Sequence, residues 1–285
     1  MDRMRRVSED IQLNDPQTLY RRWEESQWSP FAIDLSVDQD QWDDLSGDGR
    51  GLVLFVLSSL MVAEERITTK FSGLVGAYGS EEEAAFLATQ QVDEARHMQF
   101  YARIRNEVIA EPDVIARHVD HAREHVSPAF RRLFDEALVE SHHRLIAEPR
   151  SQVAKVGFVT LYHLILEATL GLTTFKFTTD YLTRNGLLPG FVDGYSRIHH
   201  DETRHIGYGV WFLRESVSTD PALGDVVRAT LRALLPSVAE SLSPSHSASQ
   251  LDLDAIGTDA EEVRDFALTG LRRRLDVIGV PLETL

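Results

Sequence analysis

Two copies of a five-residue motif, D-E-x-R-H, are the residues of this chain best suited to chemistry. The first copy spans Asp93 to His97, and the second spans Asp201 to His205, 108 residues later. In a helix, a glutamate and a histidine three residues apart project from nearly the same face, so both can bind one metal ion. A single Glu-x-x-His often occurs by chance on a solvated helix, but a duplicated motif indicates a site.

One glutamate precedes each motif in an apolar segment of helical spacing. Glu64 lies in LSSLMVAEERI, 30 residues before Glu94, and Glu167 lies in YHLILEATLG, 35 residues before Glu202. Each separation fits one helical hairpin. The sequence therefore predicts two hairpins that each offer one glutamate and one Glu-x-x-His, an arrangement typical of a metal pair inside a four-helix bundle.

This set of side chains favours two metal ions of a particular kind. Four carboxylates and two imidazoles suit iron or manganese, and the chain has no cysteine that could bind a softer metal. The four negative charges would balance two divalent ions. Without metal, the acids would repel one another inside the bundle or take up protons. The predicted cofactor is a pair of iron ions, or one manganese and one iron ion.

The aspartates that open the two motifs are predicted to support the histidines. A ligating histidine usually donates its second N–H to a carboxylate, which fixes the ring and raises its basicity. We expect Asp93 and Asp201 each to orient the histidine of the opposite motif. Arg96 and Arg204 are expected to point away from the ions and to pair with acidic neighbours or lie at the surface.

The elements that must position these residues are predicted to be helices, because no stretch combines β-branched alternation with hairpin turns. Residues 1–45, with Pro16, Pro30 and several tryptophans, are interpreted as an irregular arm that packs onto a single domain of residues 46–285. A serine-rich loop is expected over 241–257. The expected helices span 51–78, 80–109, 113–123, 127–147, 151–185, 189–218, 220–240 and 258–278.

The amino-acid composition limits the kinds of molecule that this protein is expected to bind. The 285 residues carry a formal net charge of −16, which disfavours nucleic acid and an anionic membrane surface. The positive charges near the N-terminus have no apolar stretch behind them, unlike a secretory signal. The longest apolar run, 52–63, is too short to span a bilayer. We expect a cytoplasmic protein that binds neither nucleic acid nor membrane.

From about Ile33 to Leu213 the chain resembles the ribonucleotide reductase small-subunit superfamily, in the two motifs and in the segment from Ile33 to Asp38 with Trp42. The resemblance implies a ferritin-like helical bundle with a four-helix metal-binding core, O₂ as co-reactant, an external electron donor and a homodimer. It also selects Glu64 over its neighbour Glu65. The ligands that it implies are Glu64, Glu94, His97, Glu167, Glu202 and His205.

Two branches of that superfamily offer a catalytic tyrosine. Tyr101, four residues after His97, matches the radical tyrosine of the reductase subunit, but the last tyrosine of this chain is Tyr208 and no C-terminal tyrosine relay follows. The ligand-binding oxidases have a tyrosine five residues before the third glutamate, linked by an ether bond to an aliphatic residue three after the first. Tyr162 and Ile67 reproduce those spacings. A buried, hydrogen-bonded Tyr162 without such a link is the alternative.

The resemblance is closest to the ligand-binding oxidases, so the predicted function is a di-iron or Mn/Fe oxidase or oxygenase. Its substrate would be a small organic or fatty-acid-like molecule that is hydroxylated, desaturated or oxygenated at nitrogen. The alternatives are a radical-generating reductase subunit and a non-enzymatic iron-binding protein. His142, His143, His199 and His200 are interpreted as solvated or capping residues, with an additional metal ligand as the other reading.

Overall fold

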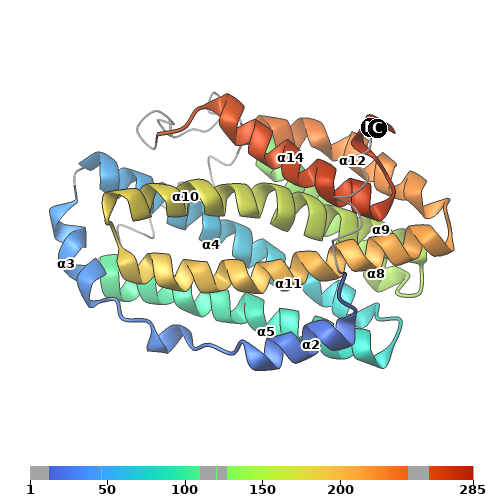
Figure 1. The fold of residues 1–285 in the computed structure, drawn as a ribbon, viewed down its shortest axis with the longest axis horizontal. Coiled ribbons are helices and arrows are strands. Elements are labelled where there is room, and N and C mark those ends of the chain that lie inside the picture. Colours follow the sequence, from blue (N-terminus) through green and yellow to red (C-terminus); the bar gives the residue numbers. More distant parts are fainter. Residues whose placement is uncertain (1–12, 46, 110–119, 121–126, 243–256, 285) are drawn as a thin grey trace, which may run out of the picture.

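The computed structural model describes residues 13–45, 47–109, 120, 127–242 and 257–284. Within these ranges the chain forms helices and no strand, which confirms the all-α prediction. Figure 1 shows the longest helices lying lengthwise along the molecule as a bundle.

Two helical hairpins carry the two motifs, as the spacing predicted. The first consists of α4 (Gly47–Gly76) and α5 (Glu81–Arg103). The second consists of one long helix, Gln152–Asn185, and α11 (Pro189–Thr219). In Figure 1, α5 and α11 run side by side across the molecule, and their contact places the two D-E-x-R-H motifs next to each other.

The turns of both hairpins follow from local sequence. Ser80 caps α5, its hydroxyl accepting a hydrogen bond from the Glu83 backbone N–H, and acidic residues fill the first turn. The second hairpin turns at Gly186, whose positive φ of 63° ends the long helix in the left-handed conformation that glycine adopts without strain.

The long helix is the most apolar element and lies in the middle of the bundle. By length and composition alone it could cross a membrane, but 78% of its most apolar window is buried inside the protein. It comprises α9 (Gln152–Val159), η4 (Thr160–Gly171) and α10 (Leu172–Asn185). The middle segment, η4, is a π-helix, a wide turn that is frequent at functional sites.

The N-terminal segment is more regular than predicted, so the interpretation of an irregular arm was wrong for residues 13–45. It contains α2 (Pro16–Glu25), the short 3₁₀ helix η1 (Pro30–Ala32) and α3 (Ser36–Asp44). The Asp15 side chain accepts from the Thr18 backbone N–H, and proline is favoured at the first helical position. The segment packs along α5 and α11.

The remaining described helices pack around the two hairpins, and the longer ones fall near their predicted positions. They are η2 (Ile104–Ile109), α7 (Pro128–Phe130), η3 (Arg131–Ala137), α8 (Leu138–Ala147), α12 (Leu223–Ser241), α14 (Ala260–Ile278) and η6 (Leu282–Thr284). The expected helix 113–123 lies outside the described residues except for residue 120, and so does most of the expected loop 241–257.

Candidate metal centre

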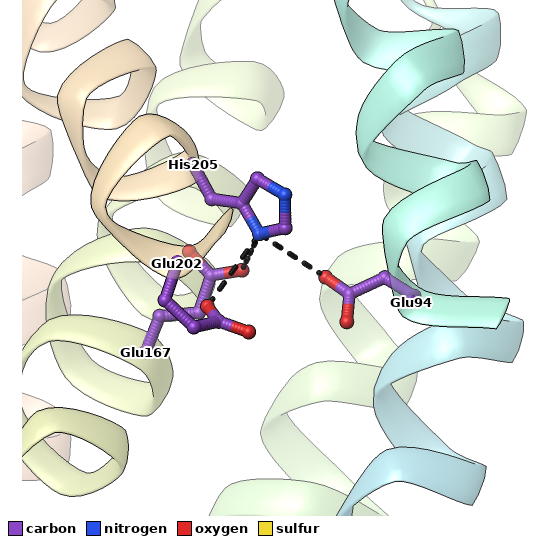
Figure 2. A group of neighbouring side chains, drawn as sticks. All are labelled: Glu94, Glu167, Glu202 and His205. Atoms are coloured by element: carbon purple, nitrogen blue, oxygen red, sulfur yellow. Dashed lines mark ion pairs between the residues drawn. The ribbon is translucent and has the colours of Figure 1, made fainter. Parts of the chain in front are cut away.

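The predicted ligand side chains come from four helices and meet inside the bundle. Their donor atoms form two groups in which all atoms lie within 4.8 Å of one another, and Glu94 belongs to both groups. Figure 2 shows the larger group, in which Glu94 reaches from α5 toward the other three side chains. The first group is Glu64, Glu94 and His97, and the second is Glu94, Glu167, Glu202 and His205.

The distances assign different places to the four glutamates. Glu94 presents one oxygen to His97 Nδ1 at 3.4 Å and the other to His205 Nδ1 at 3.6 Å. Glu202 does the same, at 3.5 Å from each histidine. Glu64 and Glu167 each face a single histidine, at 3.8 and 3.6 Å. Glu94 and Glu202 therefore lie where carboxylates could bridge two ions, and Glu64 and Glu167 lie at the two ends.

The unpaired atoms of these side chains show that the residues fit a metal pair. Buried polar atoms are normally hydrogen-bonded, and an unpaired one is unfavourable. The chemistry of the set, carboxylate oxygens with two imidazole nitrogens, suits iron and manganese. The buried atoms without a hydrogen-bond partner here include Glu64 Oε2, His97 Nδ1, Glu167 Oε2, Glu202 Oε2 and His205 Nδ1.

Burial and mutual repulsion give the metal-free centre unusual proton affinities. Burial, with the charges of neighbouring carboxylates, raises the pKa of Glu64 and Glu167 well above 4.5. Burial lowers the pKa of His97 and His205, but the surrounding carboxylates outweigh it, so both pKa values stand well above 6.5. Without metal, protons take over part of the charge balance, and metal binding must release them.

Each motif aspartate contacts the histidine of the other motif. His97 Nε2 lies 3.2 Å from Asp201 Oδ2, and His205 Nε2 lies 3.2 Å from Asp93 Oδ2. Since the second nitrogen of each ring faces an aspartate, Nδ1 is turned toward the glutamates. This exchange ties α5 to α11 and sets both rings in the orientation that a metal ligand needs.

The motif arginines pair with these aspartates, as expected. Arg204 Nη2 donates to Asp93 at 3.2 Å and also to Asp201, and Arg96 Nη1 donates to Asp93 at 2.8 Å. Burial alone would raise the pKa of Asp201, but the hydrogen bond and the charge of His97, and after them the charge of Arg204, hold that pKa below its usual range.

Two tryptophans of the N-terminal segment complete the surroundings of the aspartates, and their role was not predicted. Trp23 Nε1 donates to Asp93 Oδ1 at 2.9 Å, and Trp28 Nε1 donates to Asp201 Oδ2 at 2.8 Å. The only sequence signal was the presence of several tryptophans near the N-terminus, which does not identify a partner 70 or 173 residues away.

The two candidate tyrosines take different positions. Tyr162 is fully buried, and its hydroxyl donates to Glu94 Oε1 at 3.0 Å, so it contacts a predicted ligand directly. Ile67 is partly buried against the core cluster that contains Tyr162. Tyr101 is 2% exposed and its ring lies near that of Tyr195, at 6.5 Å between centroids. Burial raises the pKa of both Tyr101 and Tyr162, so both phenols stay protonated.

The neighbouring acid and the other histidines lie elsewhere. Glu65 is exposed and lines a surface hollow, whereas Glu64 faces His97. His142 Nδ1 contacts the Lys70 carbonyl oxygen at 2.8 Å, and His199 stacks on Phe175. In the part of the chain that the structure describes, the metal-binding groups include none of the four histidines considered as extra ligands.

Comparison with solved structures finds this architecture in proteins whose structures hold Mn/Fe or Mn/Mn cofactors. An R2-like ligand-binding oxidase variant with an aerobically reconstituted Mn/Fe cofactor matches with a TM-score of 0.81 and 24% identity over 93% of both chains. A variant with an anaerobically reconstituted Mn/Fe cofactor matches with a TM-score of 0.82 and 24% identity over 94% of both chains. Another variant, which carries a non-activated Mn/Mn cofactor, matches with a TM-score of 0.81 and 25% identity over 93% of both chains.

The fold shared with these oxidases is the ferritin-like bundle that the resemblance implied. A family model agrees with it along nearly the whole sequence. The model described as ribonucleotide reductase, small chain, matches residues 5–281, so this chain belongs to the ribonucleotide reductase small-chain family.

Proposed function

We propose that this protein is a di-metal oxidoreductase that uses O₂ to oxidise a small organic or fatty-acid-like substrate. The observation that carries the proposal is the convergence of six ligand side chains from four helices, with five of their atoms buried and unpaired. The metal pair would be Fe/Fe or Mn/Fe, because the donor set suits both and the similar oxidases contain Mn/Fe. An external electron donor would restore the reduced metals between turnovers.

Once bound, the metal pair would supply the activation of O₂. The side chains of this protein then have separate tasks. Glu94 and Glu202 would hold both ions, while Glu64 and Glu167 would each hold one. Asp93 and Asp201 would keep the histidine rings in place. The apolar bundle around them would exclude water, which protects a reactive centre from side reactions.

The unequal exposure of the ligand side chains supports a proposal for the side on which a substrate would bind. The side chains of Glu64 and Glu202 keep 11% and 19% of their surface exposed, whereas those of His97 and His205 are fully buried. The aspartates and the N-terminal tryptophans close the histidine side. We therefore place the substrate next to Glu64 and Glu202.

Tyr162 is the tyrosine with the better case for a role in the reaction. Its hydroxyl already contacts Glu94, so it can pass a proton or a hydrogen atom at the edge of the metal pair. Burial and the carboxylates around it raise its pKa, so it keeps that hydrogen at neutral pH. If the protein were instead a radical-generating reductase subunit, Tyr101 would be the residue that holds the radical.

The proposal is tested by loading the metal-free protein anaerobically with Fe(II), alone or with Mn(II), and then adding O₂. The expected result is rapid O₂ uptake at a fixed ratio to protein, with an oxidised organic product from a bound or added small molecule, detected by mass spectrometry. Glu94→Ala should abolish the uptake. Iron mineral without a product would support iron storage, and a stable tyrosyl radical that requires Tyr101 would support the reductase subunit.

We also propose a homodimer formed through α5. Its outer face exposes small apolar side chains at the alternating three- and four-residue spacing of a helix–helix contact. A two-fold axis would place the same face on both copies. The exposed side chains of this face are Ala85, Ala88, Val92 and Ala95.

A further inference from the structure

Two buried polar residues beside the metal centre belong neither to the predicted ligands nor to the aspartates that support the histidines. Gln90 lies one helical turn before Glu94 on α5, and His163 lies one turn before Glu167 on η4. Both are completely buried. A polar side chain in that position is stable only if its hydrogen-bonding groups are satisfied, so the partners of these two residues show what they do.

The hydrogen bonds connect them into a chain that ends on a predicted ligand. Gln90 Nε2 donates to Glu167 Oε1 at 3.0 Å, and Gln90 Oε1 lies 3.2 Å from His163 Nε2. As a metal ligand, Glu167 is an ionised carboxylate that only accepts, so the amide NH₂ faces Glu167 and the amide oxygen faces His163. In this arrangement His163 carries its proton on Nε2 and donates it to Gln90 Oε1, while its Nδ1 is buried without a hydrogen-bond partner.

The surroundings hold the histidine in this position. Its ring lies against Phe71, Tyr162 and Tyr208, with centroids 6.3, 5.0 and 5.4 Å away. On the opposite helix stands Gly209, where an added β-carbon would overlap the His163 side chain. Only glycine allows α11 to approach the His163 side chain so closely.

The hydrogen bonds of Gln90 and His163 make the surroundings of Glu167 different from those of Glu64, the glutamate at the other end of the centre. Glu167 Oε1 accepts from the Gln90 amide at 3.0 Å and also faces His205 Nδ1 at 3.6 Å, whereas Glu167 Oε2 is buried and unpaired. Glu64 Oε2 is also unpaired, but the Glu64 side chain remains 11% exposed and lies on the open side of the centre. One terminal carboxylate is held in place by a donor, and the other can adapt to a substrate.

We propose that Gln90 and His163 are positioning residues that hold the Glu167 carboxylate in one orientation, and so fix the geometry of the ion position beside His205. This inference rests on the proposed metal pair. The other position, formed by Glu64, Glu94 and His97, does not depend on the Gln90–His163 chain.

The test measures metal affinity in place of turnover. Gln90→Met keeps the length of the side chain but removes the amide, and His163→Leu removes the N–H that orients it. Anaerobic titration with Mn(II), followed by electron paramagnetic resonance, separates tight from weak ions. For both variants we expect the dissociation constant of one ion to rise about 10–100-fold, with the other changed by less than about threefold.

Two further variants serve as controls. His163→Gln retains an N–H donor and should restore both affinities to within about threefold of the native protein. Gln91→Met removes a neighbouring amide that donates to the Thr68 carbonyl on α4 and should leave both ions unaffected. Thermal unfolding of the metal-free variants shows whether each one folds.

The outcomes separate this inference from the proposed function. If the native protein binds two ions and Gln90→Met binds them equally well, the positioning role is wrong while the metal centre stands. An equal loss of affinity for both ions, together with a lower melting temperature of the metal-free protein, would also overturn it. That pattern would indicate that the substitution destabilises the whole fold. A native protein that binds no Mn(II) or Fe(II) would overturn both.

Discussion

Asp93 and Asp201 support one histidine each, so replacing either should affect one ion position more than the other. Asp93→Asn removes the charge behind His205, and Asp201→Asn removes the charge behind His97. We expect each variant to lower the affinity for one ion by about 10–100-fold, as is usual when a group that hydrogen-bonds a metal ligand is replaced. Metal content after dialysis against a chelator measures the loss, with the exposed Asp225→Asn as control. Retention of both ions in both variants would contradict the role of the aspartates.

The protonation of the centre predicts how stability depends on pH. In the metal-free protein the pKa values of Glu64, Glu167, His97 and His205 are raised on folding. The folded state therefore holds more protons than the unfolded state, and this stabilisation is lost as pH rises through the folded pKa values. The groups with lowered pKa values, Glu94, Asp93 and Asp201, change the stability with pH only in the acid range.

The melting temperature of the metal-free protein is accordingly expected to fall as the pH rises above about 6.5, the ordinary pKa of histidine. Metal should reverse the trend, because bound ions take the place of the protons. Calorimetric titration of metal in buffers of different ionisation enthalpy should detect proton release. A melting temperature that rises with pH in the metal-free protein would show that the carboxylates are not protonated as described.

The residues that the sequence identified share a local signature, and those that it missed do not. Glu94 with His97, and Glu202 with His205, are visible because three residues along a helix bring two ligands to one face. Gln90 and Trp23 have no such signal, since each acquires its role from a partner far away in the sequence. His163 was not singled out from the sequence, because no pattern of spacing links it to Gln90, 73 residues away.

The N-terminal segment positions α11 by capping it. Asp38, in α3, accepts hydrogen bonds from the backbone N–H groups of Gly190 and Phe191 at 2.7 and 2.6 Å, in the first turn of α11. This helix carries Glu202 and His205, so the cap fixes the end of the element that holds two ligands. Burial raises the pKa of Asp38 despite these bonds, so its carboxylate is held in a strongly desolvated place.

Replacing this cap should be measurable as lost stability. Asp38→Ala is expected to destabilise the protein by about 0.5–2 kcal/mol, the usual range for a helix cap. The exposed Asp40→Ala, two positions along the same helix, should change stability by less than about 0.5 kcal/mol. Chemical denaturation of both variants makes the comparison. Equal stabilities would mean that the two hydrogen bonds contribute nothing net.

The elements themselves were predictable to different degrees. The hairpins followed from apolar periodicity, and Ser80 and Gly186 gave clear signals for their turns. Pro16 was taken as a sign of irregular chain, although an aspartate followed by proline is a typical helix start. The π-helix around Glu167 could not be predicted, because a wide turn is decided by packing inside the bundle and not by local propensity.

For the whole molecule, the exposed face of α5 gives a test of assembly. Ala88→Arg places a long charged side chain in the middle of the proposed contact and should shift the mass in solution from a dimer to the 32.2 kDa of one chain. Ala222→Arg, exposed before α12, is the matched control and should remain dimeric. Light scattering at several concentrations measures both. A native protein that is monomeric throughout would exclude the dimer.

The proposed chemistry requires two ions bound between four helices, and anomalous diffraction observes such ions directly. Crystals of the protein loaded with iron and manganese, measured at the absorption edges of both metals, should show two peaks about 3.5–4 Å apart. One peak should lie beside Glu64 and His97, and the other beside Glu167 and His205. Anomalous maps without peaks at this centre, from crystals whose protein retains metal in solution, would contradict the assignment.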